Sequence, residues 1–349
     1  MNLHDVARKA GVSIATVSRV INRQEVVRAA TRRRVLAALE QSNYYPNINA
    51  RALSVRCNRV IALIVSSLLN PYFAEIYQMV DELAQQKGYE VLVSDTDYSP
   101  KRLAERVRLM LGRRVAGLGA VVSEMDEEVA RVLARSRIPV VVSDVQSRPP
   151  NVTNIHVNCG KGMQRVVDHL RSLGHQKMVF VDAHPTLDSI TERRKAFLDG
   201  MGPLAEAQSR IFTESESLEG GRQAIRDLLA SGFDPTAIVA VNDRMAMGVL
   251  KELHEHGIRV PEDVSVTGFD NTIYSEYVSP ALTTVDIDRK KIARYLFDTL
   301  TQPKLEGDSQ AQSAGRELFV DTHLVVREST GPASSHRALP ALVKAVSAR

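Results

Sequence analysis

The sequence predicts a small all-α helix-turn-helix headpiece followed by an α/β body of two lobes with parallel sheets. The headpiece is indicated by apolar residues at helical spacing in the first 41 positions. The body is indicated by continuous apolar runs that alternate with helical stretches from Arg59 onward. A chain of 349 residues with 44% hydrophobic residues can fill the cores of two or three such domains.

Three short helices are expected within residues 1–45. Leu3, Val6, Ala7 and Ala10 recur at helical spacing, and Gly11 permits a sharp turn after them. Ser13 is a good N-cap for a second helix over 14–22, and Thr31 is expected to cap a third. The residues of the third helix that should face inward are Val35, Leu36, Ala38 and Leu39. Two helices joined by a tight turn predict a helix-turn-helix.

The second helix has an unusual outer face. Val17, Val20 and Ile21 already form its buried stripe, so Ile14, Ala15 and Arg19 must face outward. Small or apolar side chains suit contact with thymine methyl groups in a major groove, and arginine can donate two hydrogen bonds to guanine. Side chains expected to reach phosphates or base edges are Ser13, Thr16, Ser18 and Asn22. A three-helix bundle that merely exposes these residues to solvent is the alternative.

Charge is distributed unevenly along the chain. The first 59 residues carry a formal charge of +8, whereas the net charge of the whole chain is +4, so the remainder carries −4. A small basic domain on a mildly acidic body suggests a polyanion partner for the small domain alone.

The body should hold two sets of alternating strands and helices, with a cleft between them. Ligands of open parallel sheets bind outside the carboxyl ends of the strands. Residues at these ends that are expected to crowd the cleft are Ser66, Asp95, Ser123, Asp144, Asp182, Asn242 and Asp270.

Signals for other classes of protein are weak. The glycine-rich "NCGKG" lacks the spacing of a phosphate-binding loop, "HEHG" lacks the histidine pair of a zinc protease, and no G-x-S-x-G occurs. We therefore expect no enzyme activity, no cofactor and no metal. Cys57 and Cys159 are expected to be free structural thiols. No membrane span or secretory signal is evident, so a cytoplasmic protein is expected.

These residues carry a family resemblance. "LHDVARKAGVSIATVSRVINR", "TRRRVLAAL" and "NYYPNINARALS" closely resemble the DNA-binding headpiece of LacI/GalR-type transcriptional regulators. The match continues through "IALIVSSLLNPYF", "LGHQKMVFV", "NDRMAMGVL" and "VPEDVSVTGFDN", and it spans nearly all of residues 2–332. The set Ile14, Ala15 and Arg19 is more similar to galactose-repressor and catabolite-control members than to the purine repressor. The resemblance implies a homodimer on a pseudo-palindromic double-stranded DNA operator.

The resemblance also explains the segment 46–58, which is too short to hold a core. In this family it is a hinge helix, where Leu53 matches the leucine that opens the central base step and Ala50 lies beside it. A helix that is marginal alone can fold against DNA and its dimer mate.

For the body, the resemblance implies a periplasmic-binding-protein-like (type I) domain over 59–330 with lobe crossovers near 158, 287 and 321. Effector-binding residues carried over by position are Asn70, Phe73, Asp144, Arg193, Asn242 and Asp270. Carboxylate, amide and guanidinium groups suit a polyhydroxyl ligand, a sugar or sugar phosphate. Ion pairing between the lobes is the alternative role for these groups.

Two departures weaken any claim to one sugar. Ser215 stands where the lactose repressor has a tryptophan beside its sugar, and Asn158 stands where many relatives have aspartate. The tail 331–349 is expected to be mobile, with a weak apolar helix through Leu339, Leu342 and Val346 as the alternative. It shows no leucine heptads of the kind that form a tetramer, so a dimer is expected.

The expected function is a DNA-binding regulator, most simply a repressor, controlled by a small ligand in the cleft. Control by a protein co-effector and a sugar-binding transport module are the alternatives. The identity of the effector, and whether it induces or corepresses, cannot be read from the residues.

Overall fold

The computed structural model describes residues 3–22, 27–42, 59–144, 151–183, 188–204, 209–302 and 315–333. The chain divides into two compact units, Met1–Asn58 and Arg59–Arg349. The expected hinge helix lies outside the described residues, as do Ala50, Leu53, Cys57 and residues 334–349 of the tail.

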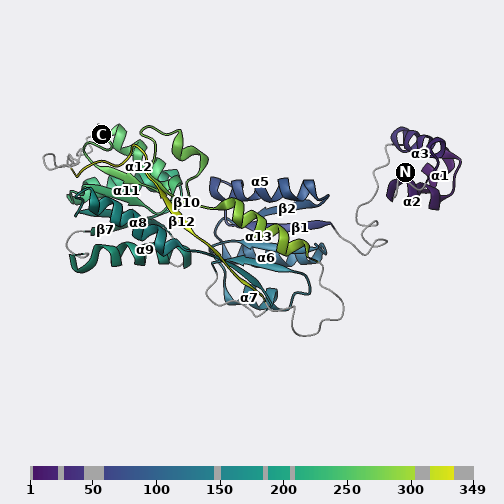
Figure 1. Ribbon diagram of the computed structural model, residues 1–349, viewed down its shortest axis with the longest axis horizontal. Coiled ribbons are helices and arrows are strands. Elements are labelled where there is room, and N and C mark those ends of the chain that lie inside the picture. Colours follow the sequence, from purple (N-terminus) through teal and green to yellow (C-terminus); the bar gives the residue numbers. More distant parts are fainter. Residues whose placement is uncertain are drawn as a thin grey trace, which may run out of the picture. The chain divides into compact units, whose positions relative to one another are not determined.

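Within its described residues, the first unit is a bundle of three helices (Figure 1). They are α1 (Leu3–Ala10), α2 (Ile14–Asn22) and α3 (Ala29–Gln41). Their shared core is built from small and β-branched side chains, among them Val6, Val17, Val20 and Val35, which are fully buried. The apolar spacing read from the sequence therefore predicted both the helices and their buried faces.

Two details of the third helix differ from expectation. Helix α3 begins at Ala29, and its N-cap residue is Arg28, which makes no capping hydrogen bond with its side chain. Thr31 consequently lies inside the helix rather than at its cap. Leu36 is 42% exposed, because the inward stripe passes through Val35 and Ala38 instead. The expectations for Thr31 and Leu36 were wrong.

The second unit contains two α/β lobes. The first lobe has a six-stranded parallel sheet in the order β11-β5-β4-β3-β1-β2. Its strands are β1 (Val60–Val65), β2 (Glu90–Asp95), β3 (Gly117–Val121), β4 (Val140–Ser143), β5 (Thr153–Val157) and β11 (Glu317–Val320). Its helices are α5 (Pro71–Gln86), α6 (Pro100–Gly112), α7 (Glu127–Ala134) and α13 (Arg289–Thr301).

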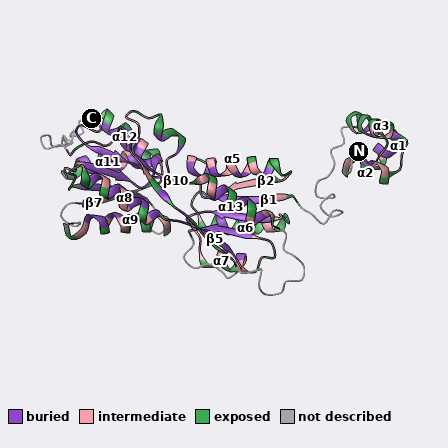
Figure 2. Ribbon diagram, in the orientation of Figure 1, coloured by how far each residue is buried: buried purple, intermediate pink, exposed green. Residues whose placement is uncertain are grey.

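Helices cover both faces of this sheet, which explains why its strands are continuously apolar. Ile61, Leu63 and Val65 of β1 belong to the core shared with α5 and α13. Ala62 and Ile64 point the opposite way, into the core beneath α6 and α7. The buried colour of Figure 2 accordingly runs along the strands and the inward helix faces.

The second lobe has a four-stranded parallel sheet in the order β7-β6-β8-β9. Its strands are β6 (Met178–Ala183), β7 (Ser209–Glu214), β8 (Ala237–Ala240) and β9 (Ser265–Thr267). Its helices pack as two pairs, α8 (Cys159–Ser172) with α9 (Asp188–Met201) and α11 (Leu218–Ser231) with α12 (Asp243–Glu255). Short 3₁₀ turns are η2 (Gly202–Leu204) and η3 (Ile273–Glu276).

The chain passes between the lobes three times. It leaves the first sheet after β5, returns after β10 (Thr284–Ile287), and leaves again between β11 and β12 (Thr322–Val325). Strands β10 and β12 pair antiparallel beside the second lobe. The first lobe is therefore completed by two segments from the end of the chain, α13 and β11.

Helices α11 and α12 approach until their backbones touch. An added Cβ would lie 2.1 Å from the carbonyl oxygen of Met245 at Gly221, and 2.0 Å from that of Leu218 at Gly248. Only glycine can occupy these two positions without moving a helix.

Candidate functional sites

The first candidate site is the outer face of α2. The Ser13 hydroxyl accepts a hydrogen bond from the Thr16 backbone N–H at 3.2 Å, which confirms Ser13 as the N-cap. Ser13, Ile14, Ala15 and Arg19 are exposed, and Thr16 and Ser18 are half-buried. The structure thus places the predicted reading residues on one solvent-facing surface, with the exception of Asn22, whose side chain is not described.

The turn that precedes this helix is fixed by α3. Gly11 has φ +60°, a left-handed conformation that favours glycine. The Arg34 guanidinium donates hydrogen bonds to the carbonyl oxygens of Ala10 at 2.9 Å and Gly11 at 3.1 Å. These bonds hold α2 at a defined angle to α1, so its outer face is presented by a rigid support.

The second candidate site is a cavity between the lobes. All six residues predicted to bind an effector line it, namely Asn70, Phe73, Asp144, Arg193, Asn242 and Asp270. They come from both lobes: α5 and the end of β4 on one side, α9 and the ends of β8 and β9 on the other. The cavity holds about 40 Å³, enough for a few water molecules. A monosaccharide would require the lobes or the lining side chains to move.

Three residues expected in the cleft do not line this cavity. Ser66 is buried and donates to the Glu124 carboxylate at 2.6 Å. Asp182 is buried against Arg194, 3.5 Å away, and Asp95 ends the edge strand β2. These expectations were wrong because lying at a strand end does not ensure that a side chain reaches the cavity.

Two of the carboxylates occupy unusual backbone conformations. Asp144 has φ +51° and Asp270 has φ +107°, in the region that costs an L-residue conformational energy. Asp144 is held there by the Val157 backbone N–H, which donates to its Oδ1 at 2.7 Å.

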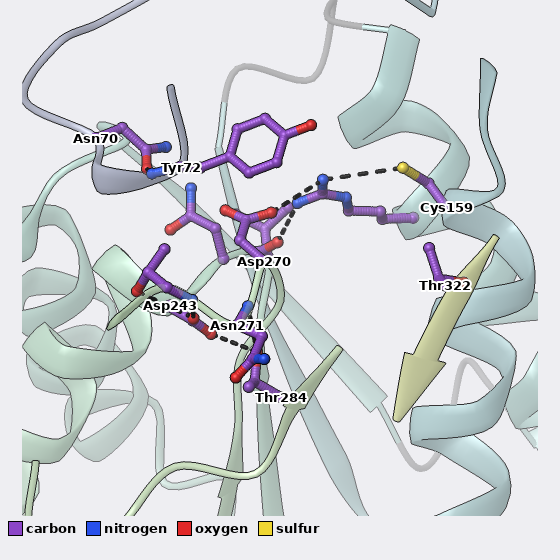
Figure 3. A network of polar contacts seen from close by, with 12 residues as sticks. Asn70, Tyr72, Cys159, Asp243, Asp270, Asn271, Thr284 and Thr322 are labelled. Atoms are coloured by element: carbon purple, nitrogen blue, oxygen red, sulfur yellow. Dashed lines mark hydrogen bonds and ion pairs between the residues drawn. The ribbon is translucent and has the colours of Figure 1, made fainter. Parts of the chain in front are cut away.

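The loop that carries Asp270 is anchored from below by Asp243, the first residue of α12. The Asp243 carboxylate accepts hydrogen bonds from the Thr272 backbone N–H at 2.7 Å and from the Thr284 hydroxyl (Figure 3). These bonds fix the chain directly after Asp270 and so hold its carboxylate at the cavity.

Arg193 is buried in the second lobe and has several partners there. Its Nη1 donates to the Val241 carbonyl oxygen at 2.7 Å, and its Nη2 lies 3.4 Å from Asp270 Oδ1 and 3.8 Å from Cys159 Sγ (Figure 3). Its Cζ lies 3.8 Å from the ring centre of Phe269. Its Nε is buried without a partner among the described residues. The Arg193–Asp270 ion pair lies within one lobe, so it does not join the lobes.

A group in the cavity that does join the lobes is Glu216, which sequence reasoning missed. Its Oε1 accepts hydrogen bonds from the Tyr98 hydroxyl at 2.6 Å, from Asn70 Nδ2 at 3.1 Å and from Asn242 Nδ2 at 2.9 Å. Glu216 is 8% exposed and lines the cavity, whereas the neighbouring Ser215 does not. The sequence comparison singled out Ser215, but the next residue, Glu216, is the one that reaches the cavity.

Burial raises the pKa values of the acidic groups that line the cavity. It raises the pKa of both Asp144 and Asp270 to about 7, although Arg193 opposes the shift at each. Burial also raises the pKa of Glu216, while its hydrogen bond from Tyr98 opposes this. Burial also raises the pKa of the Cys159 thiol to about 12, so this cysteine lines the cavity as a neutral thiol.

Stability should therefore depend on pH through these carboxyls. An aspartate that titrates at its ordinary 3.8 when unfolded and at about 7 when folded binds more protons in the folded state between those values. The free energy of unfolding should fall as pH rises through that window, and Asp144→Asn should make the fall less steep. Urea unfolding at pH 5, 6 and 7 measures this, with Asp199→Asn at an exposed position of α9 as the control. Equal slopes for wild type and Asp144→Asn would contradict the prediction.

Asn158 starts the first crossing between the lobes. Its side chain accepts a hydrogen bond from the Lys161 backbone N–H at 3.2 Å and so caps α8. Asn158 does not line the cavity described above. Within the described ranges, no cluster of three or more His, Cys, Asp or Glu side chains is arranged to hold a metal ion. No helix in the same ranges is both long and apolar enough to span a bilayer.

Comparison with known proteins gives these two sites a context. Residues 2–47 match the family described as bacterial regulatory proteins, lacI family, and residues 167–330 match a periplasmic binding protein-like domain. The HTH-type transcriptional repressor PurR of Photobacterium profundum is 31% identical over 330 residues, covering 94% of this chain and 98% of PurR. The transcriptional regulator DegA of Bacillus subtilis is 30% identical and covers 95% of this chain and 98% of DegA.

Solved structures agree with the sequence matches. A lac repressor dimer bound to operator and the anti-inducer ONPF has a TM-score of 0.77 and 30% identity, with 95% of this chain and 99% of that chain covered. A complex of the regulator CelR with cellobiose has a TM-score of 0.67 and 25% identity, with 94% and 99% covered. The predicted combination of a helix-turn-helix headpiece with a two-lobed α/β body is confirmed. With two full-length relatives at 30% identity or more, this chain belongs to the LacI family of DNA-binding transcriptional regulators, which are not enzymes.

Proposed function

We propose that this protein is a homodimeric transcriptional repressor that binds a pseudo-palindromic operator and responds to a small polyhydroxyl ligand between its lobes. The observation that carries the proposal is the joint presence of an exposed reading helix and a polar cavity formed by both lobes. Relatives of this chain are named as repressors, and one related structure is a dimer on its operator.

The reading role of α2 is supported by its surface. Ile14 and Ala15 offer apolar contact to thymine methyl groups, and Arg19 offers two donors to one guanine. For Asn22, Ala50 and Leu53 we propose DNA contacts from the family resemblance of the sequence alone. Similarity to galactose-repressor and catabolite-control members remains a proposal, since the relatives named above are the repressor PurR and the regulator DegA.

A pathway from the cavity to the first lobe is supported by Arg289, at the start of α13. Its guanidinium donates to the backbone carbonyl oxygens of Asp270 and, at 2.8 Å, of Asn271. Its Nε lies 3.0 Å from the Glu75 carboxylate on α5. A ligand that moves Asp270 would therefore shift a contact with the other lobe, which is how binding at one site can bias a two-state arrangement.

The proposed dimer is supported by large apolar side chains that the single chain leaves in solvent. Leu69 is 75% exposed and Tyr277 is 78% exposed, and Ile273 and Tyr274 are also exposed. The Ile273 backbone N–H donates to Glu75 at 2.9 Å, which holds this segment against the first lobe. Ile273, Tyr274 and Tyr277 lie within one short segment, and exposed apolar groups gathered in this way are typical of surfaces that another protein covers.

The proposed Leu53 wedge should open a flexible pyrimidine-purine step such as CG most easily. Fluorescence anisotropy on a palindromic duplex centred on CG, in excess random DNA, therefore tests the proposal. Specific binding that shifts with a pool of sugars and related polyols would support it. Specific binding indifferent to the pool would favour control by a protein co-effector, which a pull-down from cell extract would identify. If the protein binds palindromic duplexes of varied centre and half-site no better than random DNA, the proposed operator binding is refuted.

Arg19→Ala tests the reading helix alone. The substitution should cost about 1 to 3 kcal/mol of binding free energy at one base position and relax the preference there. A series of operators substituted base by base measures this, with Lys9→Ala on α1 as a basic control outside the reading face. An unchanged base preference would exclude the proposed role of Arg19.

A further inference from the structure

The cavity is lined by more acidic than basic groups. Its lining includes three carboxyls, Asp144, Asp270 and Glu216, against a single guanidinium, Arg193. Arg244 also lies near, but its Nη1 donates to the backbone carbonyl oxygen of Glu216 at 3.0 Å and it does not line the cavity. Buried carboxylates without matching cations are unfavourable, and they relieve this by taking up protons or by binding a cation.

Arg193 is poorly placed to receive an anion. Both of its terminal nitrogens are engaged, one by the Val241 carbonyl oxygen and the other by Asp270 and Cys159. Bidentate recognition of a phosphate needs two free donors on one edge of the guanidinium. Only the buried Nε lacks a partner among the described residues, and it can donate to a single ligand oxygen such as a hydroxyl.

The acceptors, in contrast, have spare capacity. The hydrogen bonds described above use one oxygen of each carboxyl: Oδ1 of Asp144, Oδ1 of Asp270 and Oε1 of Glu216. The second oxygen of each can accept from a ligand. A ligand rich in donors therefore matches the cavity, and one that carries a positive charge also neutralises it.

We propose that the cavity between the lobes takes a polyhydroxylated ligand that bears a protonated amine, and that Glu216 is the residue that selects this charge. The inference rests on the proposed effector role of the cavity and narrows it, because sugar phosphates are excluded. Glu216 is the suited residue because it contacts Asn70 and Tyr98 from one lobe and Asn242 from the other. An ammonium group beside it would replace donors that now hold the lobes together, so the same contact sets both ligand charge and lobe position.

Thermal unfolding of the full chain with matched triplets of sugars tests this. The triplets are D-glucose, D-glucosamine and D-glucose 6-phosphate, and the corresponding galactose and mannose sets. A ligand that binds only the folded state raises the midpoint according to its concentration and affinity. We expect the amine-bearing member of at least one triplet to raise the midpoint more than its neutral and phosphorylated counterparts. The largest rise from a neutral sugar or a phosphate in every triplet, or no rise from any amine, would overturn the inference.

Glu216→Gln separates charge from shape, since it keeps the size of the side chain and one acceptor oxygen. The affinity advantage of the amine over the neutral sugar should fall at least tenfold in this variant. Glu219→Gln, exposed in the first turn of α11 just after Glu216 in the chain, is the matched control and should keep the advantage. A full amine preference in Glu216→Gln would overturn the role of Glu216. If that variant does not fold, Asp144→Asn gives the complementary test: the amine should keep its advantage there, and loss of the advantage would assign the selection to Asp144 instead.

The outcome is independent of operator binding. An amine response in a protein that binds no palindrome would refute the proposed repressor and leave the ligand class intact. Specific operator binding with a preference for phosphates would do the reverse.

Discussion

Replacing Arg193 with alanine is expected to lower the free energy of unfolding by about 3 kcal/mol at pH 8. Removing one member of a buried ion pair leaves the other charge uncompensated, which is the main cost of such substitutions. The variant also loses the hydrogen bond to the Val241 carbonyl oxygen and the stacking on Phe269. Urea unfolding measures the loss, and Lys195→Ala, exposed on the same helix, is the control.

Arg193→Ala should lower the free energy of unfolding by less at pH 5 than at pH 8. Asp270 has its pKa raised to about 7 even with Arg193 beside it, so the lone carboxyl can take up a proton at pH 5. The difference in the free energy of unfolding between wild type and Arg193→Ala should therefore shrink from pH 8 to pH 5. A difference that is the same at both pH values would show that Arg193 stabilises the fold by packing and not by its charge.

Gly248→Ala should destabilise the second lobe by about 3 kcal/mol, at the upper end of the cost of overpacking. The added methyl group would lie 2.0 Å from the Leu218 carbonyl oxygen and 3.2 Å from the Arg222 backbone nitrogen. Both are backbone atoms, so α11 and α12 must separate along the face where they pack. Urea unfolding of the purified variant measures the change.

Gly112→Ala is the matched control for this substitution. Gly112 ends helix α6, and nothing lies within 4 Å of an added Cβ there. Alanine should be neutral or stabilise the helix by up to about 1 kcal/mol, because glycine is the poorer helix former. If the two variants have equal stability, the close approach of α11 and α12 does not require glycine.

Local periodicity was sufficient to predict most elements. The apolar runs around Ile61, Leu118, Val141 and Phe180 are buried on both sides, and this is why they could be recognised as strands of covered parallel sheets. Strand β5 was missed, because "TNIHV" mixes polar and apolar residues. Helix α13 and strand β11 were also missed, since their place in the first lobe depends on contacts with residues more than 150 positions away.

The residues of the cavity also fall into those that the sequence could predict and one that it could not. Asn70 and Asn242 cap helices and Asp144 and Asp270 follow strands, so a sequence match could place them by their neighbours. Glu216 precedes Ser217, the N-cap of α11, in the polar stretch "TESES", and no local pattern distinguishes it. Its importance comes from the approach of Tyr98, 118 residues earlier in the chain, which no local signal encodes.

The return of the chain to the first lobe has a consequence for synthesis on the ribosome. Strands β1 to β5 are complete at Val157, but the edge strand β11 ends at Val320, so 320 − 157 = 163 further residues must be added before that sheet is finished. At ordinary rates of translation this takes about 10 to 30 s. Until α13 emerges, Gly117 and Gly119 of β3 lack the cover of Leu300 and Leu296. A nascent chain in this interval exposes an apolar sheet face and an open edge, and it is a natural client for a ribosome-associated chaperone.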